Sequence, residues 1–319
     1  MTPDVIDLVV ARSSLQGQGV LVVDLADPAG AALPAFEAGA HIDLHLGPDL
    51  VRQYSLAGDP ADRRIWRLGI LRDPASRGGS IAAHEQLREG ARVRAGLPRN
   101  LFPLAADGAA LLVGGGIGVT PMIAMAHALH AAGRDFALHY CGRSRAGCAF
   151  VDELAAAPFA ARVHLHFDDE RGATGPLDAA ALFGAAPAGG HVYTCGPEGF
   201  MTWVLDSARA AGIPEARLHQ EHFQATAEAG GRPFEVVAKR SGRTVTVGAG
   251  ETLVAALARI GIRVQVSCEQ GICGTCMCDV LEGRPDHRDA FLTDEERDSN
   301  ELIIACRSRA LDDRLVLDV

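Results

Sequence analysis

The sequence predicts three domains in series: an antiparallel β-barrel, an α/β domain with a parallel sheet, and a small α+β domain. Three observations lead to this prediction. Short apolar runs separated by turn residues occupy the N-terminal part, strands and helices alternate after residue 106, and five cysteines gather beyond residue 267. A chain of 319 residues also exceeds one ordinary core. We therefore expect domains at 1–105, 106–224 and 233–319, with a linker at 225–232.

The first domain is predicted to be a barrel because its apolar runs are short, rich in Val, Leu and Ile, and bounded by Gly, Pro, Asp and Ser. A short helix is expected over residues 80–87. The predicted strands lie at 5–10, 20–25, 41–46 and 66–72.

From residue 106 onward, buried strands alternate with segments of helical periodicity, which predicts a parallel sheet. The expected strands lie at 109–113, 136–141, 162–167, 191–195 and 218–223, and the helices at 120–132 and 198–211. A small, polar stretch then suits a linker. The last domain should open with a hairpin at 234–238 and 244–247, continue with a helix at 253–259, and end in a strand at 315–319.

Composition narrows the functional classes. The net charge of −10 would repel nucleic-acid phosphates, so we expect no nucleic-acid partner. No apolar run approaches the roughly 18 residues that a membrane span needs. The first ten residues carry Asp4 and Asp7 and do not resemble a signal peptide. These features predict a cytoplasmic protein without a membrane contact, and we expect a monomer.

Four cysteines have the spacing of an iron–sulfur site. Cys268, Cys273 and Cys276 give C-x4-C-x2-C, and Cys306 follows at a distance. That is the plant-type ferredoxin pattern for a 2Fe–2S cluster. A structural zinc site or inert buried cysteines are the alternatives, but zinc sites usually bring two close pairs. Cys278 is surplus to four ligands and is expected to be a small buried hydrophobe.

A glycine loop follows the first strand of the α/β domain and opens a helix, which is the context of a phosphate site. The loop contributes Gly115, Gly116 and Gly118, and Thr120 and Pro121 begin the helix. It departs from the dinucleotide fingerprint because Pro121 stands where the third glycine would be. The next strand ends at Arg143 rather than at an acid that would hold a ribose.

A second strand-to-helix turn supports the glycine loop. Cys195, Gly196 and Pro197 also end a strand and begin a helix, so both turns would lie at the carboxyl edge of one sheet. An ordinary turn with a buried cysteine is the alternative.

Two motifs in the barrel suggest a flavin. Residues 52–55 lie on a strand that places two of them on one face, and residues 77–80 form a turn before the short helix. An arginine, two glycines and a serine at a helix N-terminus suit a phosphate. The alternative is a solvated arginine, a core tyrosine and a helix cap. The motif residues are Arg52, Gln53, Tyr54 and Ser55, and Arg77, Gly78, Gly79 and Ser80.

Together these residues resemble the phthalate dioxygenase reductase family, which also includes vanillate O-demethylase reductases. The resemblance covers the whole chain in the same order and implies a flavin barrel, a ferredoxin reductase-like nicotinamide domain and a plant-type ferredoxin domain. The matching segments are 52–55, 77–80, Pro98-Arg99-Asn100, 114–122, Cys195-Gly196-Pro197 and Asp286-His287-Arg288-Asp289.

The resemblance implies FMN rather than FAD, with Arg52 and the 77–80 turn near its phosphate. It places Tyr54 against the flavin, Ser55 near flavin N5, and Thr120 and Cys195 beside the nicotinamide. We therefore take Ser55, Thr120 and Cys195 as catalytic residues. NADH is the expected donor, although Arg143 and Arg145 would also accommodate the 2′-phosphate of NADPH.

The expected function is electron transfer from NADH through FMN and a 2Fe–2S cluster to a Rieske-type oxygenase, an aromatic dioxygenase or O-demethylase. A flavin can receive two electrons together and release them singly. Three alternatives stay open: an FAD-dependent reductase of another monooxygenase, a non-enzymatic 2Fe–2S sensor or structural module, and a self-contained flavin oxidase. For residues 286–289 the sequence indicates no physical role; a surface turn and a contact near the cluster are the two alternatives.

Overall fold

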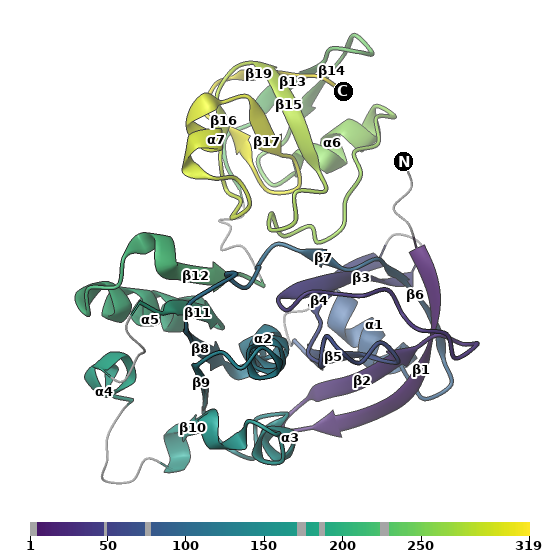
Figure 1. Ribbon diagram of the computed structural model, residues 1–319. Coiled ribbons are helices and arrows are strands. Elements are labelled where there is room, and N and C mark those ends of the chain that lie inside the picture. The colour runs from purple at the N-terminus through teal and green to yellow at the C-terminus, as the bar shows by residue number, and fades with distance from the viewer. Residues whose placement is uncertain (1–4, 48–49, 74–77, 171–176, 185–188, 224–229) are drawn as a thin grey trace. The chain divides into compact units, whose positions relative to one another are not determined.

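The computed structural model describes residues 5–47, 50–73, 78–170, 177–184, 189–223 and 230–319. The chain divides into two compact units, Met1–Glu221 and His222–Val319 (Figure 1). The first unit contains both the barrel and the α/β domain, so the boundary near residue 105 remains a prediction. Arg77 and most of the predicted linker lie outside the described residues.

An antiparallel sheet in the order β4-β3-β6-β1-β2-β5, with β7 paired to β3, forms the first part of unit 1. Its ends approach each other, because Leu56 beyond β4 bridges to Leu68 of β5 and so closes a barrel. The elements are β1 (Val5–Gln16), β2 (Val20–Ala26), β3 (Ala40–Gly47), β4 (Leu50–Ser55), β5 (Trp66–Leu71), α1 (Gly79–Gln86), β6 (Arg92–Gly96) and β7 (Arg99–Asn100).

The barrel core follows from the alternation of apolar side chains along its strands. In β3, Ile42 and Leu44 are completely buried, while Asp43 between them faces the other side. Burying each such side chain contributes about 1.5–3 kcal/mol relative to leaving it in water.

A parallel sheet in the order β10-β9-β8-β11-β12 forms the second part of unit 1. Strand β8 is central: β9 and β10 are added on one side of it, and β11 and β12 on the other. In sheets with such a reversal of strand order, ligands bind at the carboxyl ends of the strands next to it. The elements are β8 (Ala110–Gly115), η1 (Gly116–Gly118), α2 (Val119–Ala131), β9 (Phe136–Gly142), α3 (Val151–Ala155), η2 (Ala160–Arg162), β10 (Val163–Phe167), η3 (Asp168–Glu170), α4 (Ala179–Gly184), β11 (His191–Cys195), α5 (Glu198–Ala210), η5 (Glu215–Arg217) and β12 (Leu218–Glu221).

A partly buried ion-pair network joins the barrel to the α/β part of unit 1. Arg67 of β5 binds both carboxylate oxygens of Asp24 on β2, at 2.7 and 2.8 Å, and donates to Glu153 of α3 at 2.7 Å. Glu153 also accepts from Gln16 at 3.0 Å. Because each charge has its partner, the junction tolerates the burial of these groups.

Unit 2 contains a mixed sheet in the order β14-β13-β19-β15-β17 and a two-stranded sheet β16-β18. Its core includes Val236, Leu257, Ile303 and Leu315, none of which is exposed. The elements are β13 (Phe234–Ala238), β14 (Arg243–Val247), α6 (Leu253–Arg259), β15 (Met277–Glu282), β16 (Pro285–Asp286), α7 (Asp294–Ser299), β17 (Leu302–Ile304), β18 (Arg309–Ala310) and β19 (Arg314–Leu317).

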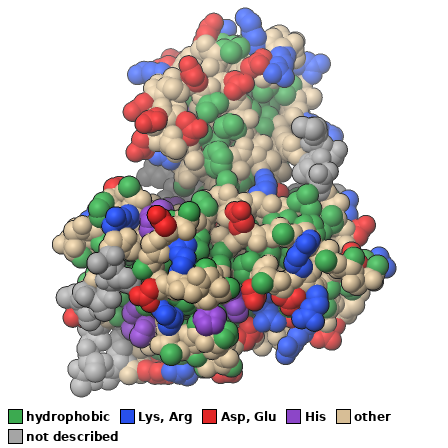
Figure 2. Space-filling model, in the orientation of Figure 1, with side chains coloured by type: hydrophobic (Ala, Val, Ile, Leu, Met, Phe, Trp, Pro, Cys, Tyr) green, Lys and Arg blue, Asp and Glu red, His purple; other side chains and the backbone are tan. Residues whose placement is uncertain are grey.

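The predicted strands and helices are present, with ends that differ by a few residues. The sequence pattern did not indicate several elements, all of them short or with mixed polarity: β6, β7, α3, α4, β16, α7, β17 and β18. Among the described residues, no helix has the length and apolar character needed to cross a bilayer. Acidic and basic side chains intermingle over the face of each unit seen in Figure 2.

Candidate functional site

Strand β4 brings Arg52 against the turn that opens α1. A Cβ atom added to Gly79 would lie 2.5 Å from Arg52 Cγ and 2.7 Å from its Nε, so any larger residue here would displace the Arg52 side chain. The two barrel motifs therefore meet, as expected for one site. Ser80 does not cap the helix; its hydroxyl accepts from the Asp73 amide at 3.1 Å.

Tyr54 lies two residues from Arg52 on the same face of β4. Burial raises the pKa of Tyr54 to about 12, while the Arg52 guanidinium acts in the opposite direction. The phenol is therefore neutral at physiological pH, and its ring and the arginine suit a flavin with a phosphate. Gln53 points elsewhere and donates to Asp43 of β3 at 3.0 Å, so it supports the strand pairing.

The glycine loop lies against the turn after β11, as the sequence predicts. A Cβ atom on Gly118 would collide with the carbonyl group of Cys195. The loop continues into α2, which begins one residue before Thr120 and includes Pro121 in its first turn. Thr120 is buried: its hydroxyl donates to the Ile117 carbonyl at 3.0 Å, and its methyl group faces β5 at Gly69.

Three side chains converge where the barrel meets the parallel sheet within unit 1. Ser55 ends β4, and its hydroxyl lies 3.3 Å from a carboxyl oxygen of Glu221 at the end of β12. Cys195 pairs with Glu221 in the β11–β12 register. Burial raises the pKa of Glu221 to about 8 and, with the charge of Glu221, raises the pKa of Cys195 well above its ordinary value. Burial thus favours the neutral forms of both the Cys195 thiol and the Glu221 carboxyl group.

The carboxyl ends of β9 and β10 carry charged side chains. Arg143 is exposed. Arg145 donates to both carboxylate oxygens of Glu170, at 2.6 and 3.0 Å, and its guanidinium stacks 4.8 Å from the centre of the Phe167 ring. Of the two arginines that could receive a 2′-phosphate, one is therefore already bound by a carboxylate.

The four cysteines of the ferredoxin-type pattern come together in unit 2 as buried free thiols. Cys268 lies within hydrogen-bonding reach of Cys273 and Cys306, and these bonds lower the pKa of the Cys268 thiol. Cys276 and Cys306 are within reach of each other.

Main-chain amides point at two of these sulfurs: Gln270 N to Cys268 Sγ at 3.3 Å, and Cys306 N to Cys276 Sγ at 3.4 Å. No group of three or more His, Cys, Asp or Glu side chains in the described part of the chain is arranged to hold a single metal ion. Four buried thiols with amide donors fit a 2Fe–2S cluster, whose sulfurs are stabilised by such bonds. Cys278 packs in the core on β15, and burial raises its pKa to about 12, so it behaves as the expected buried hydrophobe.

Comparisons with known proteins agree with this geometry. Residues 236–311 match the 2Fe-2S iron-sulfur cluster binding domain, and residues 112–206 match the oxidoreductase NAD-binding domain. Vanillate O-demethylase oxidoreductase of Pseudomonas putida is 46% identical over 319 residues, covering 98% of this chain and all of that protein. The chain belongs to this reductase family.

Solved structures extend the family relationship. Phthalate dioxygenase reductase, described as modular for electron transfer from pyridine nucleotides to [2Fe-2S], has a TM-score of 0.79 and 36% identity, covering 99% of this chain and 98% of that one. An intact type IV self-sufficient cytochrome P450 monooxygenase has a TM-score of 0.82 and 40% identity. There, 99% of this chain corresponds to 41% of the longer protein. As a family member, the chain is a nicotinamide-dependent oxidoreductase with a 2Fe–2S domain.

Three features of these sites were not identified from the sequence. Glu221 lies in a short polar strand without a motif, and its burial depends on the barrel packing beside it. Glu170 follows β10 and is 25 positions along the sequence from Arg145, the arginine that it binds. Asp289 belongs to a noted motif for which a surface turn and a contact near the cluster were the alternatives, but the burial of its carboxylate was not identified.

Proposed function

We propose that this protein transfers a hydride from NADH to FMN held by the barrel and passes single electrons through a 2Fe–2S cluster to an oxygenase. The convergence of Ser55, Cys195 and Glu221 carries the proposal. Those residues come from the barrel and from two strands of the nicotinamide domain, so they surround the place where a flavin ring and a nicotinamide would meet. The flavin supplies the step from two-electron to one-electron transfer.

The barrel residues supply the proposed flavin site. Arg52, beside the amides at the start of α1, would bind the flavin phosphate, and Tyr54 would lie along the ring. Ser55 would donate to flavin N5 and so position the reacting atom. Gly78, Gly79 and Ser80 complete the turn, together with Arg77. The resemblance of these motifs to phthalate dioxygenase reductase favours FMN over FAD.

The parallel sheet supplies the proposed nicotinamide site. Gly115, Gly116 and Gly118 would present amides to the pyrophosphate at the N-terminus of α2. Pro121, which has no N–H to donate, occupies the first turn of that helix. Thr120, Cys195, Gly196 and Pro197 would border the nicotinamide. The bidentate pair of Arg145 with Glu170 supports NADH, since a 2′-phosphate would have to displace a carboxylate and then lie beside it. Arg143 remains for the ribose side of the site.

Cys268, Cys273, Cys276 and Cys306 are the proposed cluster ligands. We propose domain limits at 1–105, 106–224 and 233–319, and one complete electron path per chain, as expected for a monomer. A cytoplasmic location suits these reduced thiols.

The electron acceptor is an oxygenase component, and we propose the Rieske type. Support comes from the demethylase and dioxygenase systems to which full-length relatives belong. The likeness to a self-sufficient cytochrome P450 supports a haem monooxygenase as a second candidate acceptor. Full-length identity to a reductase favours enzymatic electron transfer over a 2Fe–2S sensor or structural module.

Anaerobic titration of the purified protein with NADH, followed by visible absorption and EPR, tests the proposal. We expect uptake of about three electrons, two on the flavin and one on the cluster. A cluster signal that appears only with dithionite, and never with NADH, would refute it. Extraction of the flavin separates FMN from FAD, and reconstitution with each oxygenase type separates the two acceptors.

A further inference from the structure

A buried carboxylate lies at the end of the Asp286-His287-Arg288-Asp289 motif. The Asp289 side chain has no exposed area, whereas Asp286 in the same motif is 28% exposed and pairs with Arg288. A carboxylate is seldom buried unless hydrogen bonds and charges compensate for the lost hydration. Its partners therefore indicate what it does.

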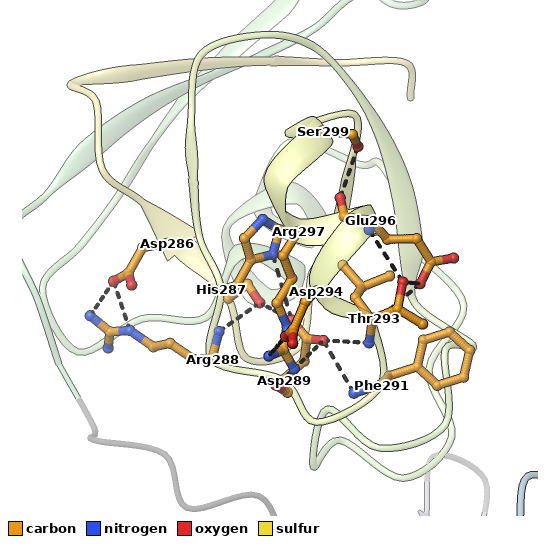
Figure 3. Close-up of polar contacts among 12 residues, drawn as sticks. Asp286, His287, Arg288, Asp289, Phe291, Thr293, Asp294, Glu296, Arg297 and Ser299 are labelled. Carbon is orange, nitrogen blue, oxygen red and sulfur yellow. Dashed lines mark hydrogen bonds and ion pairs between the residues drawn. The ribbon is translucent and has the colours of Figure 1, made fainter. Parts of the chain in front are cut away.

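Three donors bind the Asp289 carboxylate (Figure 3). The amides of Phe291 and Leu292 donate to Oδ2 at 3.2 and 2.9 Å, and the Ser308 hydroxyl donates to Oδ1 at 2.9 Å. The two amides fix the turn that leads to α7. Ser308 lies two residues after Cys306, so Asp289 holds the chain directly beyond the fourth proposed ligand.

The segment that follows Asp289 also binds the cysteine loop. The amide of Ala290 donates to the carbonyl of Gly271 at 3.0 Å, and Gly271 lies between Cys268 and Cys273. A Cβ atom on Gly271 would be 3.2 Å from the Asp289 Cα, and one on Gly274 would collide with the Phe291 ring. The turn organised by Asp289 is therefore packed against the loop that bears three of the cysteines.

The side chains of Arg297 and His287 complete the surroundings of the Asp289 carboxylate. Arg297 Nη2 donates to the Asp289 carbonyl at 2.8 Å and lies 4.0 Å from its carboxylate. His287 Nδ1 lies 3.7 Å from the carboxylate (Figure 3). The Arg297 guanidinium is always cationic and offsets the buried negative charge, so Asp289 can act as a fixed connection.

We propose that Asp289 is a positioning residue for the 2Fe–2S cluster. Together with the neighbouring Ala290, it joins the loop that carries Cys268, Cys273 and Cys276 to the turn after β17 that carries Cys306. The inference rests on the proposed cluster ligands. Side chains behind the ligands of metal centres set ligand orientation in this way, and removing one typically weakens retention of the metal by 10–100-fold.

The test compares Asp289→Asn and Ser308→Ala with the wild type in the full chain. Asparagine preserves the shape but removes the negative charge and replaces one of the two accepting oxygens by an NH2 group. Asp286→Asn is the matched control from the same motif. Val236→Ala, a core truncation in β13, controls for general loss of stability. The readouts are the rate of cluster bleaching by a chelator, the g values of the dithionite-reduced cluster, and flavin reduction by NADH.

We expect Asp289→Asn to bleach at least about 10-fold faster and to have shifted g values. Ser308→Ala should change both readouts in the same direction but less, and flavin reduction should not change in either. Val236→Ala should leave the g values of its loaded cluster as in wild type. Wild-type bleaching and g values in Asp289→Asn would overturn the inference.

If Asp289→Asn retains no cluster, the test rests on Ser308→Ala. A wild-type bleaching rate and wild-type g values in Ser308→Ala would then overturn the inference. A wild-type protein that binds no cluster would instead refute the proposed function together with this inference. If the wild-type protein holds an intact cluster and both variants have wild-type bleaching rates and g values, only the inference about Asp289 is refuted.

Discussion

The hydroxyl of Ser55 lies 3.3 Å from the carboxyl group of Glu221, although the two residues are 166 positions apart in the chain. One ends a barrel strand and the other ends the last strand of the parallel sheet. The bond makes the protonation of Glu221 relevant to Ser55. A serine has one proton to donate, and an ionised carboxylate is a strong acceptor for it.

We predict that flavin reduction by NADH slows as the pH rises through about 8. Burial raises the pKa of Glu221 to about 8. Below this pH, the neutral acid donates to Ser55 and leaves the serine proton for flavin N5. Above it, the carboxylate takes that proton. Stopped-flow reduction rates across this range measure the effect.

Glu221→Gln should remove this pH dependence, because the amide N–H donates to Ser55 at every pH. Glu215→Gln, on the surface beside Arg209, is the matched control and should retain the wild-type profile. A profile in Glu221→Gln that still falls near pH 8 would contradict this account.

Cys273→Ser should eliminate the cluster and reduction of cytochrome c while largely sparing flavin-dependent reduction of ferricyanide. Serine is a poor substitute for a thiolate ligand of iron. Cys278→Ala is the control, because Cys278 packs in the core and should not bind iron. Unchanged cytochrome c activity in a Cys273→Ser protein that lacks the cluster would exclude the proposed electron path.

Glu170→Gln should shift the preference from NADH toward NADPH. Without the carboxylate, Arg145 becomes available to a 2′-phosphate, and the negative charge that repels the phosphate is gone. A gain of about 10-fold in the ratio of kcat/KM for NADPH to that for NADH corresponds to about 1.4 kcal/mol. Asp206→Asn, which alters an exposed acid on α5, should not change the ratio. An unchanged ratio in Glu170→Gln would indicate that this pair does not select the cofactor.

Gly79→Ala should weaken flavin binding by about 10-fold or more, since a displaced phosphate-binding arginine loses charge-assisted bonds. The added Cβ would come within 2.5 Å of Arg52 and force its side chain away. Gly199→Ala is the control, because a Cβ there meets nothing within 4 Å. Flavin fluorescence titration of the apoprotein measures both variants, and equal affinities would argue against Arg52 as the phosphate ligand.

The sequence was sufficient to predict those parts of the fold that depend on local patterns. Gly118 and Cys195 follow strands whose apolar runs are clear, and parallel strands place their carboxyl ends at one edge. Cys268, Cys273 and Cys276 lie within one loop, so their proximity follows from spacing alone.

Features that depend on distant packing were not predictable in the same way. Glu221 is polar, burial raises its pKa, and its partner Ser55 comes from a barrel strand 166 positions earlier. Asp289 is likewise polar, and it is buried because Ser308 and the cysteine loop, which are distant from it in the sequence, pack around it. Arg67 gives no sign in the sequence that it will join Asp24 to Glu153. A single sequence contains no record of which charges will pair.

The position of β19 in unit 2 has a consequence for biosynthesis. This strand follows every other strand of the unit in the chain, yet it lies in the middle of the sheet, parallel to β13 and antiparallel to β15. During translation, the hairpin of β13 and β14 is made before β19, so one edge of β13 stays unpaired until β19 has been synthesised. Such long-range pairing is slow, and exposed strand edges attract other chains. Unit 1 can form earlier, so a nascent chain that ends before β19 should have a folded first unit and a second unit whose sheet is incomplete.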